Sequence, residues 1–270
     1  MRVALTGASG IIGSAVARAL SAAGHEVTPL GRAQGWQLGM PAPLGGQEAL
    51  IHCALAHAPG RYRGGEGDDP AGFLAANLDG TRALFDQAAQ QGLGRVLFLS
   101  SRAVHDGYPA GMRLPDDLPP RPTSLYGQVK AGAEAHLARL PLSGCAIRAT
   151  GIYGPGPAHK WRPLFAEYLA GRPIAPRVAT EVHVDDLAQA LILLLTHPAP
   201  LPAVNCSDLI LDRHDLLGMV RDLTACPHPP PPRADPSPLR LPDCTALTTL
   251  GWHPGGVALL SRALPALLRD

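Results

Sequence analysis

Three side chains have the chemistry to exchange a proton with a carbonyl or hydroxyl oxygen. Tyr126 and Lys130 are four residues apart in a segment with helical spacing, so both lie on one face of the expected helix. A tyrosine hydroxyl has a pKa of about 10, and a neighbouring ammonium favours its ionised form at lower pH. Ser101 ends an apolar segment and could hydrogen-bond the reacting oxygen. These residues predict proton exchange coupled to hydride transfer.

The spacing of Tyr126 and Lys130 alone is also typical of a solvated helix face, and three features favour catalysis. A glycine-rich turn lies upstream, and Ser101 stands 25 residues before Tyr126. The composition also favours arginine, because the chain has 23 Lys and Arg together but only two lysines, Lys130 and Lys160. A lysine retained under such a bias indicates a position where arginine would not serve.

The glycine-rich turn contains Gly7, Gly10 and Gly13, between an expected strand over Val3–Thr6 and an apolar helix that ends near Ala23. Glycine allows a positive φ and a close backbone approach, and the helix N-terminus offers N–H groups to a pyrophosphate. A purely structural turn is the alternative, but the strand–turn–helix context favours dinucleotide binding.

The end of the second expected strand, Glu26–Leu30, carries information about the type of dinucleotide. An acidic residue there would favour NAD, but the chain continues with Gly31 and Arg32. Arg32 could pair with a 2′-phosphate, so NADP is expected in preference to NAD. Arg32 could instead be an ordinary surface residue, with the cofactor choice made elsewhere.

Composition excludes several other classes of protein. The chain has 270 residues and a net charge of +1, which gives no electrostatic reason to expect nucleic acid or a membrane as a partner. No segment reaches the roughly 20 apolar residues of a membrane span, and the first residues predict a strand rather than a signal peptide. Five cysteines without a CxxC pair predict reduced thiols in the cytoplasm and no metal site.

Strands and helices alternate along the first two thirds of the chain, which predicts an α/β protein with a Rossmann-type, doubly wound parallel sheet and a small C-terminal substrate lobe. Further strands are expected over Ala49–Leu55, Arg95–Ser101 and Cys145–Thr150, and helices over Phe73–Gln91, Leu125–Leu140, Asp185–Thr196 and Val257–Leu268. The dinucleotide-binding domain is expected over 1–152, rejoined by about 181–197, and the lobe over 153–180 and 198–270. Residues 59–70 are expected to form a surface loop.

The motifs Thr6–Gly13, Ser100–Ser101 and Tyr126–Lys130 resemble those of the extended short-chain dehydrogenase/reductases, the NAD-dependent epimerase/dehydratase family. Further matches run along most of the chain, at Ile51–Ala54, Asn77–Thr81, Ile152–Gly156 and His183–Ala188. The chain is identified as a reductase-like or atypical member. The resemblance implies a homodimer built from the helices around 74–91 and 125–140.

The resemblance also implies a role for individual residues. The implied catalytic set is Ser101, Tyr126 and Lys130. The implied cofactor-binding set is Gly7, Gly10, Ile11, Ile12, Gly13, Arg32, Ala54, Leu55, Asn77, Ser100, Tyr126, Lys130 and Ile152. Asn77 could instead be a helix cap. Asp185 and Asp186 are expected to cap a helix and join the lobe rather than act as acids.

Three departures from the family pattern narrow the reaction. No acidic pair follows Ser101, which disfavours dehydration. His105 replaces the usual tyrosine and could relay a proton, contact the substrate or simply form part of a loop. Gly151 stands where many nucleotide-sugar enzymes carry asparagine, which argues against a nucleoside-diphosphate substrate.

These observations predict an NAD(P)-dependent oxidoreductase or epimerase that acts on a hydroxyl or carbonyl of a sugar or nucleotide-sugar-like small molecule. Net reduction and epimerisation stay open. The alternatives are a nucleotide-sugar 4-epimerase and a non-catalytic NADP-binding regulator, and the Tyr126–Lys130 pair counts against the regulator. Candidate substrate contacts in the lobe are Trp161, Arg162, Arg177 and Trp252.

Overall fold

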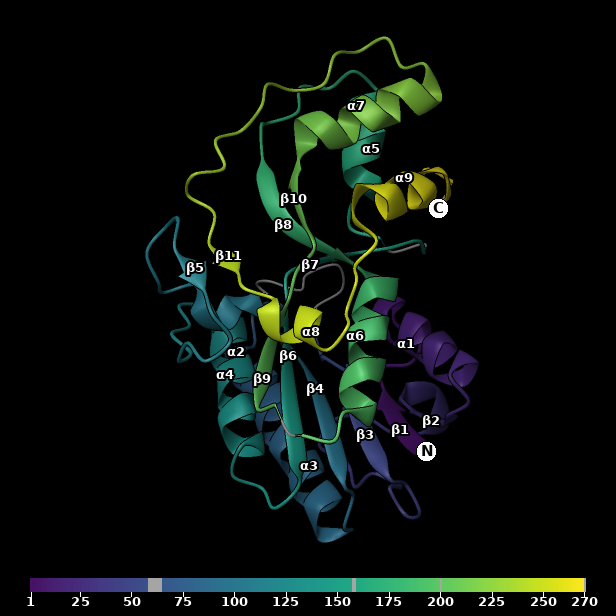
Figure 1. The fold of residues 1–270 in the computed structure, drawn as a ribbon, viewed down its shortest axis with the longest axis vertical. Helices are drawn as coiled ribbons and strands as arrows, with labels where there is room; N and C mark the ends of the chain where they lie inside the picture. Colours follow the sequence, from purple (N-terminus) through teal and green to yellow (C-terminus); the bar gives the residue numbers. More distant parts are fainter. Residues whose placement is uncertain (58–64, 157–158, 200, 270) are drawn as a thin grey trace.

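The structure, a computed structural model, describes residues 1–57, 65–156, 159–199 and 201–269. Its main sheet has six parallel strands in the order β2-β1-β3-β4-β6-β9 (Figure 1). Their bounds are β1 Arg2–Thr6, β2 Glu26–Leu30, β3 Ala49–His52, β4 Arg95–Ser101, β6 Ser143–Ala149 and β9 Ala203–Cys206. The strand order reverses between β1 and β3, where doubly wound sheets bind ligands. The predicted fold class is confirmed.

Helices cover both faces of the main sheet because its central strands are apolar on both sides. In β1, Val3 and Leu5 face one core and Ala4 faces the other, as the two-residue period of a strand requires. The first face is covered by α1 Ile11–Ala22 and α6 Val184–Thr196, and the second by α3 Gly80–Gln90 and α4 Leu125–Leu137 (Figure 1).

A smaller unit stands over the carboxyl ends of the main strands (Figure 1). Its three-stranded sheet places β8 Val178–His183 between β7 Gly151–Tyr153, which is parallel to it, and β10 Leu209–Asp212, which is antiparallel. Helices α5 Arg162–Leu169, α7 Arg213–Thr224 and α9 Gly256–Leu267 bury a third core around Phe165, Leu217 and Leu260. Because β7 follows β6 almost directly, the two sheets meet at the carboxyl edge.

The C-terminal segment differs from the expectation of an irregular lobe over 198–270. Strand β9 pairs with β6 at the edge of the main sheet, and α8 Thr245–Thr249 packs Leu247 into the core beneath α6. Strand β10 and helix α7 were not expected. Four-residue strands such as β9, which contains the polar Asn205, carry too little periodicity to be recognised from sequence.

Two other elements differ in their bounds. Strand β3 ends at His52 rather than Leu55, and the expected helix over 73–91 consists of α2 Pro70–Leu74, a π-helical turn over Ala75–Asp79 and α3. Two short parallel strands, β5 Arg113–Leu114 and β11 Leu241–Pro242, join the loop before α4 to the C-terminal segment. The first part of the loop expected over 59–70 lies outside the described residues.

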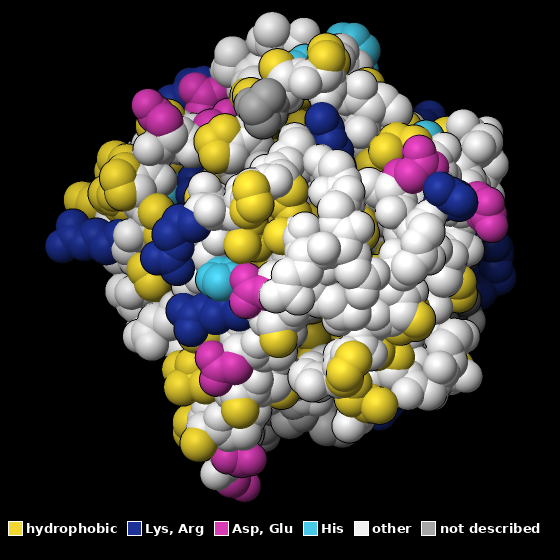
Figure 2. Space-filling model, turned by 90° about the horizontal axis from the view of Figure 1, so that it is seen from below, with side chains coloured by type: hydrophobic (Ala, Val, Ile, Leu, Met, Phe, Trp, Pro, Cys, Tyr) yellow, Lys and Arg dark blue, Asp and Glu magenta, His cyan; other side chains and the backbone are white. Residues whose placement is uncertain are grey.

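The surface of the molecule mixes charges of both signs. Figure 2 shows acidic and basic side chains interspersed on the face opposite the smaller unit. Among the described residues, no helix is both long and apolar enough to cross a lipid bilayer.

Candidate active site at the carboxyl edge of the sheet

The glycine turn is built so that two of its glycines cannot be replaced. Gly7 has a φ of 72°, and a Cβ there would lie 3.0 Å from the backbone nitrogen of Ala54. A Cβ at Gly13 would lie 2.1 Å from the carbonyl oxygen of Gly7. Gly10 is exposed and begins α1 without a side-chain cap. The turn therefore keeps its backbone free of side chains at a helix N-terminus, an arrangement that suits a dinucleotide pyrophosphate. Ile11 and Ile12 are half-buried in the first turn of α1.

A chain of hydrogen bonds holds the segment after β3 against this turn. The Thr6 hydroxyl accepts hydrogen bonds from the N–H groups of Cys53 and Ala54, both at 3.1 Å. It therefore donates its own hydrogen to Nδ1 of His52, at 2.7 Å, and Nε2 of His52 donates to the Thr81 hydroxyl at 3.0 Å. Burial lowers the pKa of His52 to about 3, so the ring is neutral. No local pattern in the sequence indicates this role of His52.

Asn77 holds the next part of the same segment. Its amide oxygen accepts from the N–H of Ala56 and its nitrogen donates to the carbonyl of Ala56, both at 2.7 Å. The nitrogen also donates to the carbonyl of Phe73. Asn77 thus holds the segment that follows the half-buried Ala54 and Leu55. It lies inside the π-helical turn, which does not agree with the alternative interpretation as a helix cap.

Arg32 follows the end of β2, which is hydrogen-bonded to the glycine turn. The N–H of Gly7 donates to the carbonyl of Leu30 at 3.2 Å, and Arg32 is the exposed first residue of a short 3-10 helix two residues later. Its predicted contact with a 2′-phosphate stays a prediction.

Ser101 lies at the carboxyl end of β4, and helix α4, which packs against β4, carries Tyr126 and Lys130. Ser101 is the last residue of β4, and its hydroxyl accepts from the N–H of Ala103 at 3.2 Å. Tyr126 lies in the first turn of α4, whose cap is the Ser124 hydroxyl. A Cβ at Gly127 would lie 2.7 Å from the carbonyl oxygen of Ala103. Glycine therefore lets the first turn of α4 approach the segment after Ser101.

Lys130 lies one turn further along α4 and is almost fully buried. Its ammonium donates to the carbonyl of Leu99 at 2.7 Å and lies 4.6 Å from the Phe98 ring centroid and 5.8 Å from that of Tyr126. Burial lowers the pKa of Lys130 to about 8, against the opposing effects of Cys53 and Glu134. Most molecules therefore still carry a cation beside Tyr126 at neutral pH.

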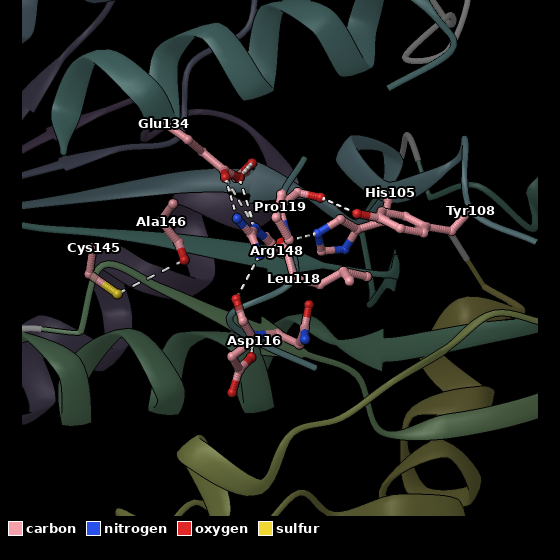
Figure 3. Close-up of polar contacts among 11 residues, drawn as sticks. His105, Tyr108, Asp116, Leu118, Pro119, Glu134, Cys145, Ala146 and Arg148 are labelled. Carbon is pink, nitrogen blue, oxygen red and sulfur yellow. Dashed lines mark hydrogen bonds and ion pairs between the residues drawn. The ribbon is translucent and has the colours of Figure 1, made fainter. Parts of the chain in front are cut away.

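A buried ion pair fixes α4 on the sheet (Figure 3). Glu134 lies one turn beyond Lys130. Its carboxylate accepts hydrogen bonds from Nη2 of Arg148 at 2.7 Å and from Nε at 3.1 Å, and both side chains are buried. Nη1 of Arg148 donates to the carbonyl of Asp116, whose carboxylate accepts from the N–H of Asn205. The hydroxyl of Ser100 also donates to Glu134. Ser100 thus faces α4, and the structure does not bring the Ser100 hydroxyl to the glycine turn.

His105 is fully buried beside the loop that precedes α4 (Figure 3). Its Nε2 donates to the carbonyl of Leu118 at 3.0 Å, and its ring meets Tyr108 edge-on. Burial lowers the pKa of His105, and Nδ1 has no hydrogen-bond partner among the described residues. These contacts favour the loop interpretation over a proton relay.

The junction of β8 and α6 has a structural role. The N–H of Asp185 donates to Nδ1 of His183, so the histidine caps α6. The carboxylate of Asp186 accepts from the N–H of Gly255, and its carbonyl accepts from the buried indole of Trp252. Asp186 therefore joins the C-terminal segment to α6, and Trp252 packs in the core rather than facing a substrate. Among the described residues, no cluster of three potential ligands could hold a metal ion.

Comparisons with known proteins agree with this architecture. The sequence model of the NAD dependent epimerase/dehydratase family matches residues 3–206. The chain therefore belongs to this family of NAD(P)-dependent enzymes, as its motifs predicted. Residue Ile152 of β7, at the entrance to the smaller unit, lies within the matched region.

Individual relatives differ in length and in described activity. The UDP-glucose 4-epimerase of Streptomyces lividans is 25% identical over 98% of this chain and 93% of that protein. An uncharacterised protein of Mycobacterium tuberculosis is 27% identical over 210 residues, which are 72% of this chain but only 20% of that longer protein. The structure of Thermus thermophilus UDP-glucose 4-epimerase with NAD is 26% identical over 94% of each chain, with a TM-score of 0.73.

Proposed function

We propose that the protein is an NADP-preferring oxidoreductase of the extended short-chain type, acting on a hydroxyl or carbonyl of a sugar or sugar-like metabolite. The observation that carries the proposal is the buried ammonium of Lys130 beside the Tyr126 ring, at the sheet edge that also holds Ser101 and the glycine turn. A cation at that position favours the ionised form of a phenol.

Each group then has a defined task. The turn from Gly7 to Gly13 and the N-terminus of α1 would hold the pyrophosphate, and Arg32 the 2′-phosphate. A bound nicotinamide supplies or accepts the hydride. The Tyr126 hydroxyl exchanges a proton with the substrate oxygen, and the Ser101 hydroxyl hydrogen-bonds that oxygen. Lys130 uses one of its three donors on Leu99, so two donors would remain for the ribose of a bound cofactor.

The direction of the reaction is tested by cofactor balance. Purified protein would be screened against sugars and nucleotide sugars, with the co-purified nucleotide identified by mass. A net reductase consumes NADPH stoichiometrically, whereas a nucleotide-sugar 4-epimerase keeps its cofactor bound and shows no net consumption. A regulator that binds NADP without catalysis would turn over none of these compounds.

Two substitutions test the assigned groups. Tyr126→Phe should abolish measurable turnover, whereas Tyr108→Phe, outside the site, should not; unchanged turnover in Tyr126→Phe would refute the catalytic role. Arg32→Ala should reduce the ratio of NADP to NAD affinity by roughly 10- to 100-fold, because charge-assisted hydrogen bonds contribute about 1.5–3 kcal/mol. Arg139→Ala, an exposed arginine on another helix end, is the control.

The proposal includes a homodimer formed through α3 and α4 and a location in the cytoplasm. The location is proposed from the five cysteines, which are odd in number and include no CxxC pair. Sedimentation at several protein concentrations would test the oligomeric state.

A further inference from the structure

The second lysine of the chain is paired with a buried acid at the junction of the two sheets. Lys160 lies just before α5, and its ammonium forms an ion pair with the carboxylate of Glu181 in β8. The Glu181 side chain is 6% exposed and the Lys160 side chain 29%, so the lysine side of the pair reaches solvent. Burial raises the pKa of Glu181 and lowers that of Lys160.

Gly151 provides the space for this pair. It stands opposite Glu181 in the pairing of β7 with β8, and its φ lies outside the left-handed region. A Cβ at this position would lie 2.4 Å from Oε2 of Glu181 and 2.8 Å from Nζ of Lys160. The position therefore holds glycine because of its neighbours and not because of its backbone conformation.

The pair lies near the candidate active site. Ala149 is paired with Ser101 in the main sheet, and Gly151 follows two residues later, so its Cα lies within about 12 Å of that of Ser101. The indole of Trp161 lies 5.3 Å from the Lys160 ammonium and stacks on Tyr153 at a centroid distance of 4.7 Å. Both rings are buried in the core of the smaller unit, so they hold the segment that carries Lys160 in a fixed position.

The ammonium has unused donor capacity. It carries three N–H groups, and among the described residues its contacts are the Glu181 carboxylate and the face of the Trp161 ring. The formal charge of the pair is zero, so an anionic ligand group would meet the Glu181 carboxylate as well as the ammonium. An uncharged oxygen accepts from the ammonium without that repulsion.

We propose that Lys160 and Glu181, seated against Gly151, form a subsite in which the Lys160 ammonium donates a hydrogen bond to a hydroxyl or carbonyl oxygen of an uncharged, polyhydroxylated part of the substrate. This inference rests on the proposed function for the identity of the ligand as a substrate. Lys160 is a binding residue that affects substrate affinity, whereas Lys130 acts beside Tyr126.

The two lysines allow a direct measurement of binding that does not need turnover. Protein labelled with ¹³C at the lysine Cε has two signals, and Lys160→Arg assigns them. D-glucose is expected to shift the Lys160 signal saturably, while D-glucuronate and UDP leave it in place. No shift with D-glucose, or a shift with D-glucuronate or UDP alone, overturns the proposal.

Steady-state kinetics separate this inference from the proposed function. With a sugar substrate found by the screen, Lys160→Met should raise KM at least tenfold and change kcat by no more than about twofold. The control variant Arg172→Met removes an exposed cation of the same unit and should change neither constant. Gly151→Ala keeps both charges but displaces them, and should also raise KM; this variant covers the case in which Lys160→Met does not fold.

The outcomes are distinguishable. Turnover that requires Tyr126 but has the same KM in Lys160→Met and Gly151→Ala overturns the subsite and leaves the proposed function in place. A saturable Lys160 shift with D-glucose in a protein that turns over no sugar supports the subsite and refutes the proposed function.

Discussion

Lys130 and Lys160 have opposite electrostatic surroundings. Lys130 lies near the carboxyl edge of the main sheet, and Lys160 lies at the junction with the smaller unit. Lys130 is 4% exposed, and its hydrogen bond goes to a backbone carbonyl, so its charge is solvated by dipoles and aromatic faces and stays available to Tyr126. Lys160 is directly paired with a carboxylate. An ammonium without a carboxylate partner, such as Lys130, stabilises the negative charge of a phenolate that forms beside it. An ammonium paired with a carboxylate, such as Lys160, can still donate a hydrogen bond, but the pair has no net charge.

The largest expected effect is the loss of kcat on removal of the Lys130 ammonium, and it tests whether the two lysines differ in function. Lys130→Met should lower kcat by roughly 10²- to 10⁴-fold, the usual contribution of proton transfer by a positioned group. Lys160→Met should act on KM instead. Measuring both constants for both variants on one substrate checks the contrast, and equal losses of kcat would contradict it.

The carboxylates of the two regions should differ in their contribution to folding. Glu134→Gln leaves the buried Arg148 uncompensated, and breaking a buried pair typically costs about 3–5 kcal/mol of unfolding free energy. Glu181→Gln should cost less, because the partly exposed Lys160 can be rehydrated. Urea unfolding of both variants tests the order. Glu48→Gln, in an exposed pair with Arg2, is the control and should change stability by less than about 1 kcal/mol.

The pH profile gives the smallest effect and concerns Lys130 alone. Its pKa is lowered to about 8, so the cation beside Tyr126 is lost as the pH rises through that value, and turnover should decline there. In Lys130→Arg the side chain stays charged, and any remaining activity should decline only at higher pH. The contribution of Lys130 to stability has the opposite sign. Between about pH 8 and 10.4 this lysine binds more protons in the unfolded chain than in the folded one, so its own contribution to stability rises with pH. The slope of unfolding free energy against pH in this range should therefore be lower in Lys130→Met than in the wild type.

Much of the site could be predicted because local patterns specify it. The βαβ unit around Gly7–Gly13 and strand β4 have strong periodicity and clear glycine signals, and the helical spacing of Tyr126 and Lys130 places both on one face. Adjacent residues of a strand alternate between its faces, but the sequence does not show that Ser100 is the one whose hydroxyl meets Glu134 of α4.

The buried pairs could not be predicted. Glu134 and Arg148 come from a helix and a strand, and Lys160 and Glu181 are separated by α5, so each pair depends on tertiary register that no local pattern encodes. His52 has the same difficulty, since its two hydroxyl partners come from β1 and α3. The short strands β9 and β10 are defined mainly by the neighbours with which they pair.

The tight seat at Gly151 also constrains the order in which this chain can change. A larger residue at 151 requires the ends of the Glu181 and Lys160 side chains to move, so it displaces their ion pair. Loss of the pair first removes this cost of a Cβ at 151, whereas the reverse order first displaces Lys160 from the buried Glu181 carboxylate. Position 151 is therefore epistatic to positions 160 and 181, and lineages that keep both charges are expected to remain at glycine.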